Sequence, residues 1–125
     1  MIERRMFPRF PVRLRAEISQ DGDESFEAVV IELSRGGLSL ETTKEIAELL
    51  AQGGSVLMPG ERFRVQLEFS ESTGCSGSLK VECLTAHARR ISQSRYHIGA
   101  RFEGIETGEA RLEAYLNWCA QQRGC

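Results

Sequence analysis

From Val12 to Ser19 the sequence alternates between apolar and polar residues, which is the pattern of a half-buried β-strand. Similar patterns recur downstream, and they predict further strands at Phe26–Leu33, Leu38–Glu41, Phe63–Phe69, Leu79–Arg90 and Tyr96–Phe102. The middle of the second strand is apolar on both faces, which indicates a central strand that is covered on both sides.

Two segments instead show the helical period. Thr42 and Glu45 have the spacing of a capping box, and Gly53-Gly54 supplies a stop, so we predict a helix over Thr42–Gln52. A second apolar stripe predicts a closing helix over Thr107–Gln122.

Six strands with mostly short connections imply an antiparallel sheet. With so few residues, the sheet must curl or close to bury its apolar face. The expected fold is therefore all-β with flanking helices, a six-stranded antiparallel β-barrel capped by the C-terminal helix. We expect one domain over residues 12–125, because 125 residues suffice for one domain and not for two.

Residues 1–11 are predicted to be a flexible arm outside the barrel. Pro8 and Pro11 disfavour helical backbone at and before their positions. Although the whole chain has a net charge of −2, residues 1–15 hold five arginines and one glutamate, a charge of +4. The remaining 110 residues hold 11 basic and 17 acidic residues, a charge of −6.

The cations of the arm are suited to a specific anionic ligand. The planar fork of arginine pairs bidentately with phosphate and with the O6/N7 edge of guanine, whereas lysine supplies charge without that geometry. The candidate ligand residues here are Arg4, Arg5 and Arg9. The alternative is a solvated, frayed terminus.

The segment Glu32–Gly37 combines a strand end with a tight turn. Its glycine amides could form an anion-binding nest. Glu32 shares alternating parity with Phe26, Ala28 and Val30, so we expect it at the mouth of the barrel or against a donor such as a guanine edge. The alternative is an ordinary strand-ending turn with a solvated glutamate.

Together these pieces resemble the PilZ domain family. The segment "RRMFPR" resembles the Arg-x-x-x-Arg arm of that family through Arg5 and Arg9, with Arg4 as the frequent preceding arginine. The segment "ELSRGG" resembles the motif Asp/Asn-x-Ser-x-x-Gly, with Ser34 and Gly37 in register. "HIGARF" at 97–102 resembles the late Gly-x-x-Phe strand, so the resemblance covers nearly the whole chain.

The resemblance implies a six-stranded barrel that binds cyclic di-GMP. Arg5 and Arg9 would grip guanine and phosphate groups with help from Arg4, and Ser34 and the Gly37 region would line the opposite side. His87 falls where some relatives present a side chain to a guanine face, although it could equally face solvent or a neighbouring residue. The chain departs from the family pattern at Glu32, where an extra methylene displaces the carboxylate.

The first functional hypothesis is a cytoplasmic cyclic di-GMP receptor whose arm reorders on binding and presents a new surface to a partner protein. The alternative is a PilZ-like adaptor that binds no nucleotide because of Glu32. A small barrel that binds single-stranded nucleic acid is disfavoured by the acidic body and the 7% aromatic content.

Other function classes find little support in the sequence. We identify no paired base and nucleophile, no phosphate-binding lysine loop and no metal-ligand spacing, so we expect neither an enzyme nor a cofactor. The four cysteines are expected to be free thiols of a reducing compartment. No apolar run approaches the length of a membrane span, so we expect no membrane association.

Overall fold

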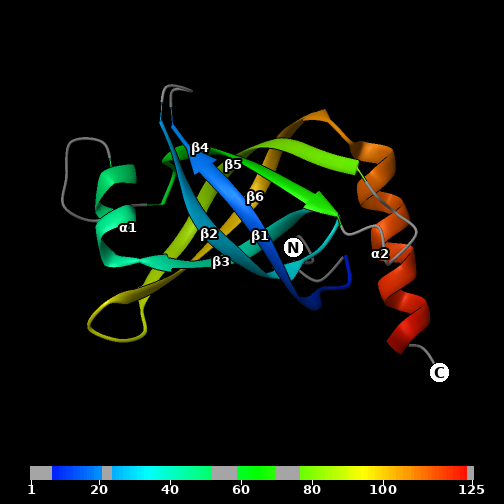
Figure 1. Cartoon of the computed structure of the whole chain (residues 1–125), viewed down its shortest axis with the longest axis horizontal. Helices are drawn as coiled ribbons and strands as arrows, with labels where there is room; N and C mark the ends of the chain where they lie inside the picture. Colours follow the sequence, from blue (N-terminus) through cyan, green and yellow to red (C-terminus); the bar gives the residue numbers. More distant parts are fainter. Residues whose placement is uncertain (1–6, 21–23, 52–58, 70–76, 124–125) are drawn as a thin grey trace, which may run out of the picture.

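The computed structural model describes residues 7–20, 24–51, 59–69 and 77–123. Its strands form a closed antiparallel barrel in the order β1-β2-β3-β6-β5-β4, with α1 and α2 at opposite ends (Figure 1). This confirms the expected six-stranded barrel. The elements are β1 (Phe10–Ser19), β2 (Ser25–Leu33), β3 (Gly37–Thr43), α1 (Lys44–Leu50), β4 (Arg62–Phe69), β5 (Gly77–Arg90), β6 (Arg95–Thr107) and α2 (Glu109–Arg123).

The barrel interior is filled by every second residue of the strands. β4 shows this most regularly, since its residues are alternately exposed and buried along its whole length. The side chains that are almost completely buried include Ile18, Val30, Leu40, Phe63, Leu79 and Ile98. Burying each such side chain contributes about 1.5–3 kcal/mol, so this shared interior is what closes the sheet.

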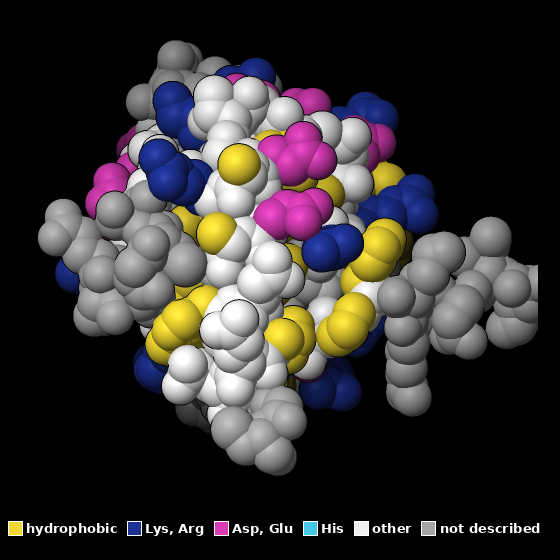
Figure 2. All heavy atoms as spheres, turned by 90° about the vertical axis from the view of Figure 1, so that its right-hand side faces the viewer, with side chains coloured by type: hydrophobic (Ala, Val, Ile, Leu, Met, Phe, Trp, Pro, Cys, Tyr) yellow, Lys and Arg dark blue, Asp and Glu magenta, His cyan; other side chains and the backbone are white. Residues whose placement is uncertain are grey.

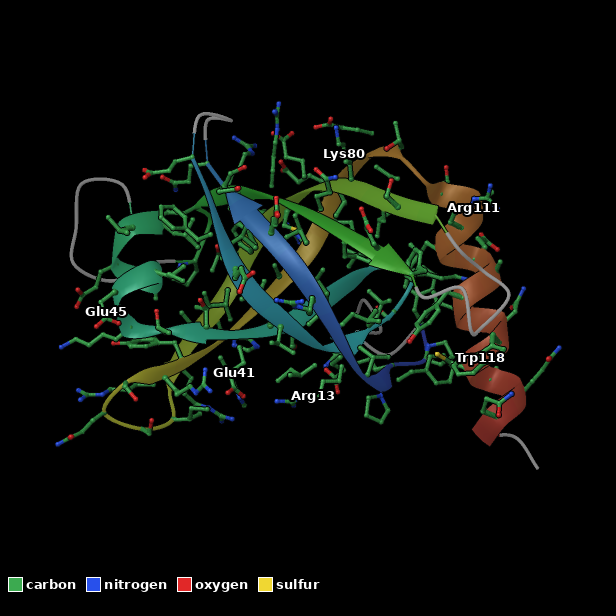
Figure 3. The ribbon with its side chains drawn as sticks, in the orientation of Figure 1. Arg13, Glu41, Glu45, Lys80, Arg111 and Trp118 are labelled. Atoms are coloured by element: carbon green, nitrogen blue, oxygen red, sulfur yellow. The ribbon has the colours of Figure 1, made fainter. Side chains whose placement is uncertain are left out.

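The two helices cover the open ends of the barrel. On the α1 side Ala47 and Leu50 are buried, and on the α2 side Leu112 and Leu116 are buried. The ring of Phe69 stacks on that of Tyr115 with centroids 4.8 Å apart, and Trp118 extends the stack on the barrel side of α2 (Figure 3). The C-terminal helix therefore acts as the expected cap.

The first helix is shorter than predicted. Thr42 and Thr43 continue β3, because they pair with Tyr96 and Arg95 of β6. Thr43, not Thr42, is the N-cap, and its hydroxyl accepts a hydrogen bond from the Ile46 amide at 3.2 Å. The prediction that Thr42 caps the helix was therefore wrong.

β6 is longer than predicted, because it continues beyond Phe102 and pairs with β5 as far as Thr107. The charged residues of this extension and Gly104 obscure the apolar alternation. Three irregularities in the β5–β6 pairing also shift the side-chain parity there.

β2 is covered on one face, not on both as predicted. Val29 and Ile31 are only half-buried, because an antiparallel barrel leaves its outer face to solvent. The pairing with β3 contains an irregularity between Val30 and Glu32, after which Glu32 lies opposite Ser39. The extra residue reverses the alternation, so Leu33 points inward and Glu32 points outward.

Two cysteines fall within the described residues, and both are buried thiols. Cys83 lies inside the barrel, where burial raises the pKa of its thiol to about 12. Cys119 lies on the buried side of α2. Cys75 and Cys125 lie outside the described residues. Over the described ranges, no helix is both long and apolar enough to cross a membrane.

Candidate ligand-binding site

A hollow of about 740 Å³ lies on the outer face of the barrel where β2, β3, β5 and β6 meet. Five of the predicted ligand residues line it, namely Arg9, Glu32, Ser34, Gly37 and His87. We call this hollow the groove. Arg4 and Arg5 lie outside the described residues. Residues from four separate segments of the chain thus converge on one hollow.

A row of four residues crosses the groove from strand to strand. Glu32 pairs with Ser39, Ser39 pairs with Gly99, and Gly99 pairs with His87. Three strand spacings of about 4.8 Å make this row about 14 Å long. The row sets a carboxylate at one end and an imidazole at the other, with two small residues between them.

Irregular pairing places both ends of this row. The irregularity before Glu32 turns its side chain outward, and a second one between Thr85 and His87 does the same for His87. Thr85 itself is buried in the barrel. The prediction that Glu32 shares a face with Ala28 and Val30 was wrong, because uninterrupted alternation does not hold across the irregularity.

The turn between β2 and β3 is organised by Ser34. Its hydroxyl oxygen accepts hydrogen bonds from the amides of Gly36 and Gly37, each at 3.1 Å, and its side chain is almost fully buried. The Ser34 amide in turn donates to the Gly37 carbonyl at 2.9 Å. The predicted anion nest is thus filled by the protein's own hydroxyl, and Ser34 shapes the groove from within the turn.

Glycines let the walls of the groove approach one another. A Cβ at Gly37 would overlap the carbonyl oxygen of Ala100 on β6, so only glycine permits this pairing. At Gly99, a Cβ would occupy the position of the His87 imidazole, which therefore lies directly over the Gly99 backbone. The ring of Phe7 covers Gly36 in the same way, with its nearest atom 2.9 Å from where a Cβ would be.

The charged groups of the groove are loosely paired. Arg9 Nη1 lies 3.8 Å from Glu32 Oε1, and these side chains are 54% and 40% exposed. A pair this long and this open to water contributes little to stability. Both groups are therefore available to exchange this contact for a ligand.

Arg35 belongs to the turn but does not line the groove. Its Nη2 lies 3.1 Å from Glu113 Oε1 on α2, which ties the turn to the C-terminal helix. Figure 2, which views the molecule from the α2 end, shows acidic and basic side chains next to one another on that face.

A second hollow of about 770 Å³ spans the outer faces of β1, β2 and β3 near α1. Arg13 and Glu41 lie on this side of the barrel (Figure 3). Two ion pairs occupy part of its charge, Arg95 with Glu41 at 3.2 Å and Arg15 with Glu27 at 3.4 Å. None of the predicted ligand residues lines it, so the groove is the better candidate site.

Comparison with known domains identifies the fold. The PilZ domain matches residues 3–118. This chain belongs to the PilZ family. PilZ domains are a non-catalytic receptor family, which agrees with the expectation that the chain is not an enzyme.

Solved PilZ structures have the same architecture at low sequence identity. The Bacillus subtilis inhibitor of motility, MotI/DgrA, matches with a TM-score of 0.69 and 17% identity over 98% of this chain and 52% of its own. The Escherichia coli YcgR PilZ domain with c-di-GMP matches with a TM-score of 0.66 and 15% identity, over 96% and 94% of the two chains. K. pneumonia MrkH in its c-di-GMP complex has a TM-score of 0.66 and 20% identity, over 99% and 56%.

This chain therefore spans about half the length of MotI and MrkH. At these identities the likeness shows the fold alone. No curated protein matches the sequence closely enough to count as a relative.

Sequence reasoning missed several residues that line the groove, namely Phe7, Gly36, Ser39, Ala86, Gly99, Ala100 and Arg101. Ser39 and Gly99 could have been found from strand register, since they lie between Glu32 and His87 in the row. Nothing in the sequence distinguishes Arg101 from any other polar residue of a strand. Among the residues described here, no cluster of three His, Cys, Asp or Glu side chains could hold a metal ion.

Proposed function

We propose that this protein is a receptor for cyclic di-GMP, which binds in the groove and docks the arm over it. Phe10 and Pro11 of the predicted arm already pair with Leu33 and Glu32 in β1, so the segment that docks ends at Arg9. The observation that carries the proposal is the convergence of Arg9, Glu32, Ser34, Gly37 and His87 on one hollow of about 740 Å³. Further support comes from structures of the same fold that were solved with c-di-GMP, those of YcgR, MrkH and Borreliella burgdorferi PlzA.

The arginines of the arm bind the phosphates and the guanine edges of the ligand. Arg9 lies in the groove, and Arg4 and Arg5 precede it in the sequence, so the three can act together on a dianionic ligand. Their forked side chains match both phosphate oxygens and the guanine O6/N7 edge. Binding of the dianionic ligand neutralises the mutual repulsion of these arginines.

Glu32 and His87 contact the guanine bases from opposite ends of the row. The Glu32 carboxylate is an acceptor for the N–H groups of a guanine Watson–Crick edge. The His87 ring lies over Gly99, and its open face is a stacking surface for a base. Gly37 and Ser34 keep the turn in the shape that leaves room for the ligand.

Ligand binding then transmits a signal through the arm. Exchanging the Arg9–Glu32 contact for ligand contacts moves the segment that carries Phe7, whereas Phe10 stays paired with Leu33 in β1. The reordered surface is offered to a downstream protein, in a cytoplasmic setting.

Calorimetric titration of the full chain with cyclic di-GMP tests this proposal. We expect saturable binding to the wild type and a loss of at least tenfold in affinity for Arg5→Ala and Arg9→Ala. Arg15→Ala is the matched control, because Arg15 is 87% exposed on β1 and pairs with Glu27. Absence of binding heat from the wild type up to high micromolar ligand would refute the receptor function.

The rival function is a PilZ adaptor that binds no nucleotide, with its arm docking on an acidic partner protein. The observation behind it is Glu32, which stands where the family pattern has Asp or Asn and whose carboxylate lies 3.8 Å from Arg9. The variant Glu32→Asp distinguishes the adaptor hypothesis from the receptor hypothesis. Binding that appears only in Glu32→Asp favours the adaptor, whereas binding by both proteins favours the receptor.

A further inference from the structure

Arg101 lies in the groove although it belongs to neither the arm nor the turn. It is exposed on the outer face of β6, and its strand partner on β3 is Gly37. Because Gly37 has no side chain, nothing from that position separates Arg101 from the turn. A cation therefore stands on the β6 side of the groove, across from the arm.

The neighbouring charges leave this guanidinium available. Glu103, two residues further along β6, is held by Arg62 at 2.6 and 3.2 Å. This contact is the main cause of the lowered pKa of the Glu103 carboxyl, and the charge of Arg101 adds a smaller effect. Among the ion pairs of the described residues, none includes Arg101. Arg101 feels the charge of Glu103 but forms no ion pair within the described part of the chain, so its donors can turn to a ligand.

Arg35 shows the opposite arrangement. By sequence it is the obvious cation of the turn, since it lies between Ser34 and Gly36, but its guanidinium is drawn to Glu113 on α2. Arg35 is not among the described residues that line the groove. The cation that serves this edge of the groove therefore comes from β6 and not from the turn itself.

We propose that Arg101 is an additional ligand-binding residue, which pairs bidentately with one phosphate of the ligand while the arm holds the other. This inference rests on the proposed receptor function. A cyclic dinucleotide carries its two phosphates on opposite sides of its ring. Two strand spacings, about 10 Å, separate β2, next to the arm, from β6, so one ligand can meet a cation on each flank.

The test uses the full chain and calorimetry with cyclic di-GMP at several salt concentrations. We expect Arg101→Gln to bind about 10- to 100-fold more weakly than the wild type, as for loss of a charge-assisted contact. Its affinity should also depend less on salt, because one phosphate contact is gone. Arg101→Lys keeps the charge without the fork and should fall between the two.

Arg35→Gln is the matched control, since it removes an arginine from the turn itself but not from the groove. We expect its affinity to stay within about twofold of the wild type, because the exposed pair that it breaks contributes little. Thermal melts of all variants check the fold. If Arg101→Gln does not fold, Arg101→Lys decides, and wild-type affinity in that variant overturns the bidentate contact.

The possible failures are distinguishable. Wild-type affinity in Arg101→Gln overturns the role of Arg101 and leaves the receptor function standing. An equal loss in Arg35→Gln and Arg101→Gln means that bulk charge matters and not a defined contact, which also overturns it. A wild type that gives no binding overturns the receptor function and this inference together.

Discussion

Gly99→Ala offers a direct test of the imidazole platform in the groove. The new methyl group would occupy the space of the His87 ring, whose nearest atoms lie over the Gly99 backbone. His87 is exposed and can turn about its side-chain bonds. The ring therefore moves aside, and the strands can stay in place.

The expected change in stability is small. Alanine loses less chain entropy on folding than glycine, which favours the variant by about 0.5–1 kcal/mol. Displacing His87 from its position costs about 0.5–1.5 kcal/mol. The two effects nearly cancel, and for a chain of this size 1 kcal/mol corresponds to about 4 °C in Tm. We therefore expect Tm to change by less than about 4 °C.

The expected change in binding is larger. If His87 stacks on a base, losing that contact costs about 1–3 kcal/mol, which is about 5- to 150-fold in Kd for cyclic di-GMP. The assay is calorimetric titration of four proteins, the wild type, Gly99→Ala, His87→Ala and the double variant. Once His87 is gone, the added methyl group has nothing to displace, so the double variant should bind like His87→Ala alone.

Two results would refute this reasoning. Wild-type affinity in Gly99→Ala would mean that the ring position does not matter for binding. Fully additive losses in the double variant would mean that the methyl group blocks the groove directly and does not act through His87.

The remaining predictions concern the turn and the barrel interior. Gly37→Ala should destabilise the fold by about 1–3 kcal/mol in urea unfolding, because its Cβ overlaps the backbone carbonyl of Ala100, which cannot turn aside. Gly104→Ala is the control: no atom lies within 4 Å of its added Cβ, so equal losses in both would contradict the argument. Ser34→Ala leaves two turn amides without their acceptor and should lower the free energy of unfolding by about 1–3 kcal/mol. Ser34→Thr keeps a hydroxyl and should retain part of that stability. An unchanged unfolding midpoint in Ser34→Ala would count against this role of Ser34. Burial raises the pKa of the Cys83 thiol to about 12, so the stability that its protonated form provides is complete below the unfolded pKa of about 8.5 and is lost as pH rises toward 12. Urea unfolding at pH 7–11 should therefore show a steeper decline for the wild type than for Cys83→Ala, and parallel curves would contradict it.

The fold followed from local pattern with few errors. Alternation in β1 and β4 and the apolar stripe in α2 show which side chains are buried. The hydrophobicity of each residue decides this, so it can be predicted from the sequence. The start of α1 and the far half of β6 were mispredicted, because local pattern is not what determines them. Thr42 and Glu103–Thr107 join strands through pairing with distant partners, which local propensity does not report.

The candidate site was anticipated in composition but not in geometry. The arginine arm and the turn after β2 pointed to an anionic ligand, and Arg9, Ser34 and Gly37 do line one groove. The face on which Glu32 lies was mispredicted, and the amides expected to bind an anion are engaged by Ser34. Whether a side-chain hydroxyl accepts the hydrogen bonds of the turn amides depends on the folded shape of the turn, which the residue types alone do not give.

The sequence by itself determined that this chain closes a small β-barrel between two helices, because burial of alternate apolar residues leaves no other solution for so short a chain. Only the tertiary structure decided which side chains face the groove. A single extra residue in a strand reverses every later side chain, and partner strands distant in sequence fix where that residue falls. That is why Glu32 and His87 turn outward. Contacts between distant segments likewise decide the place of the arginines, since Glu113 on α2 draws Arg35 away and leaves Arg101 of β6 in the groove.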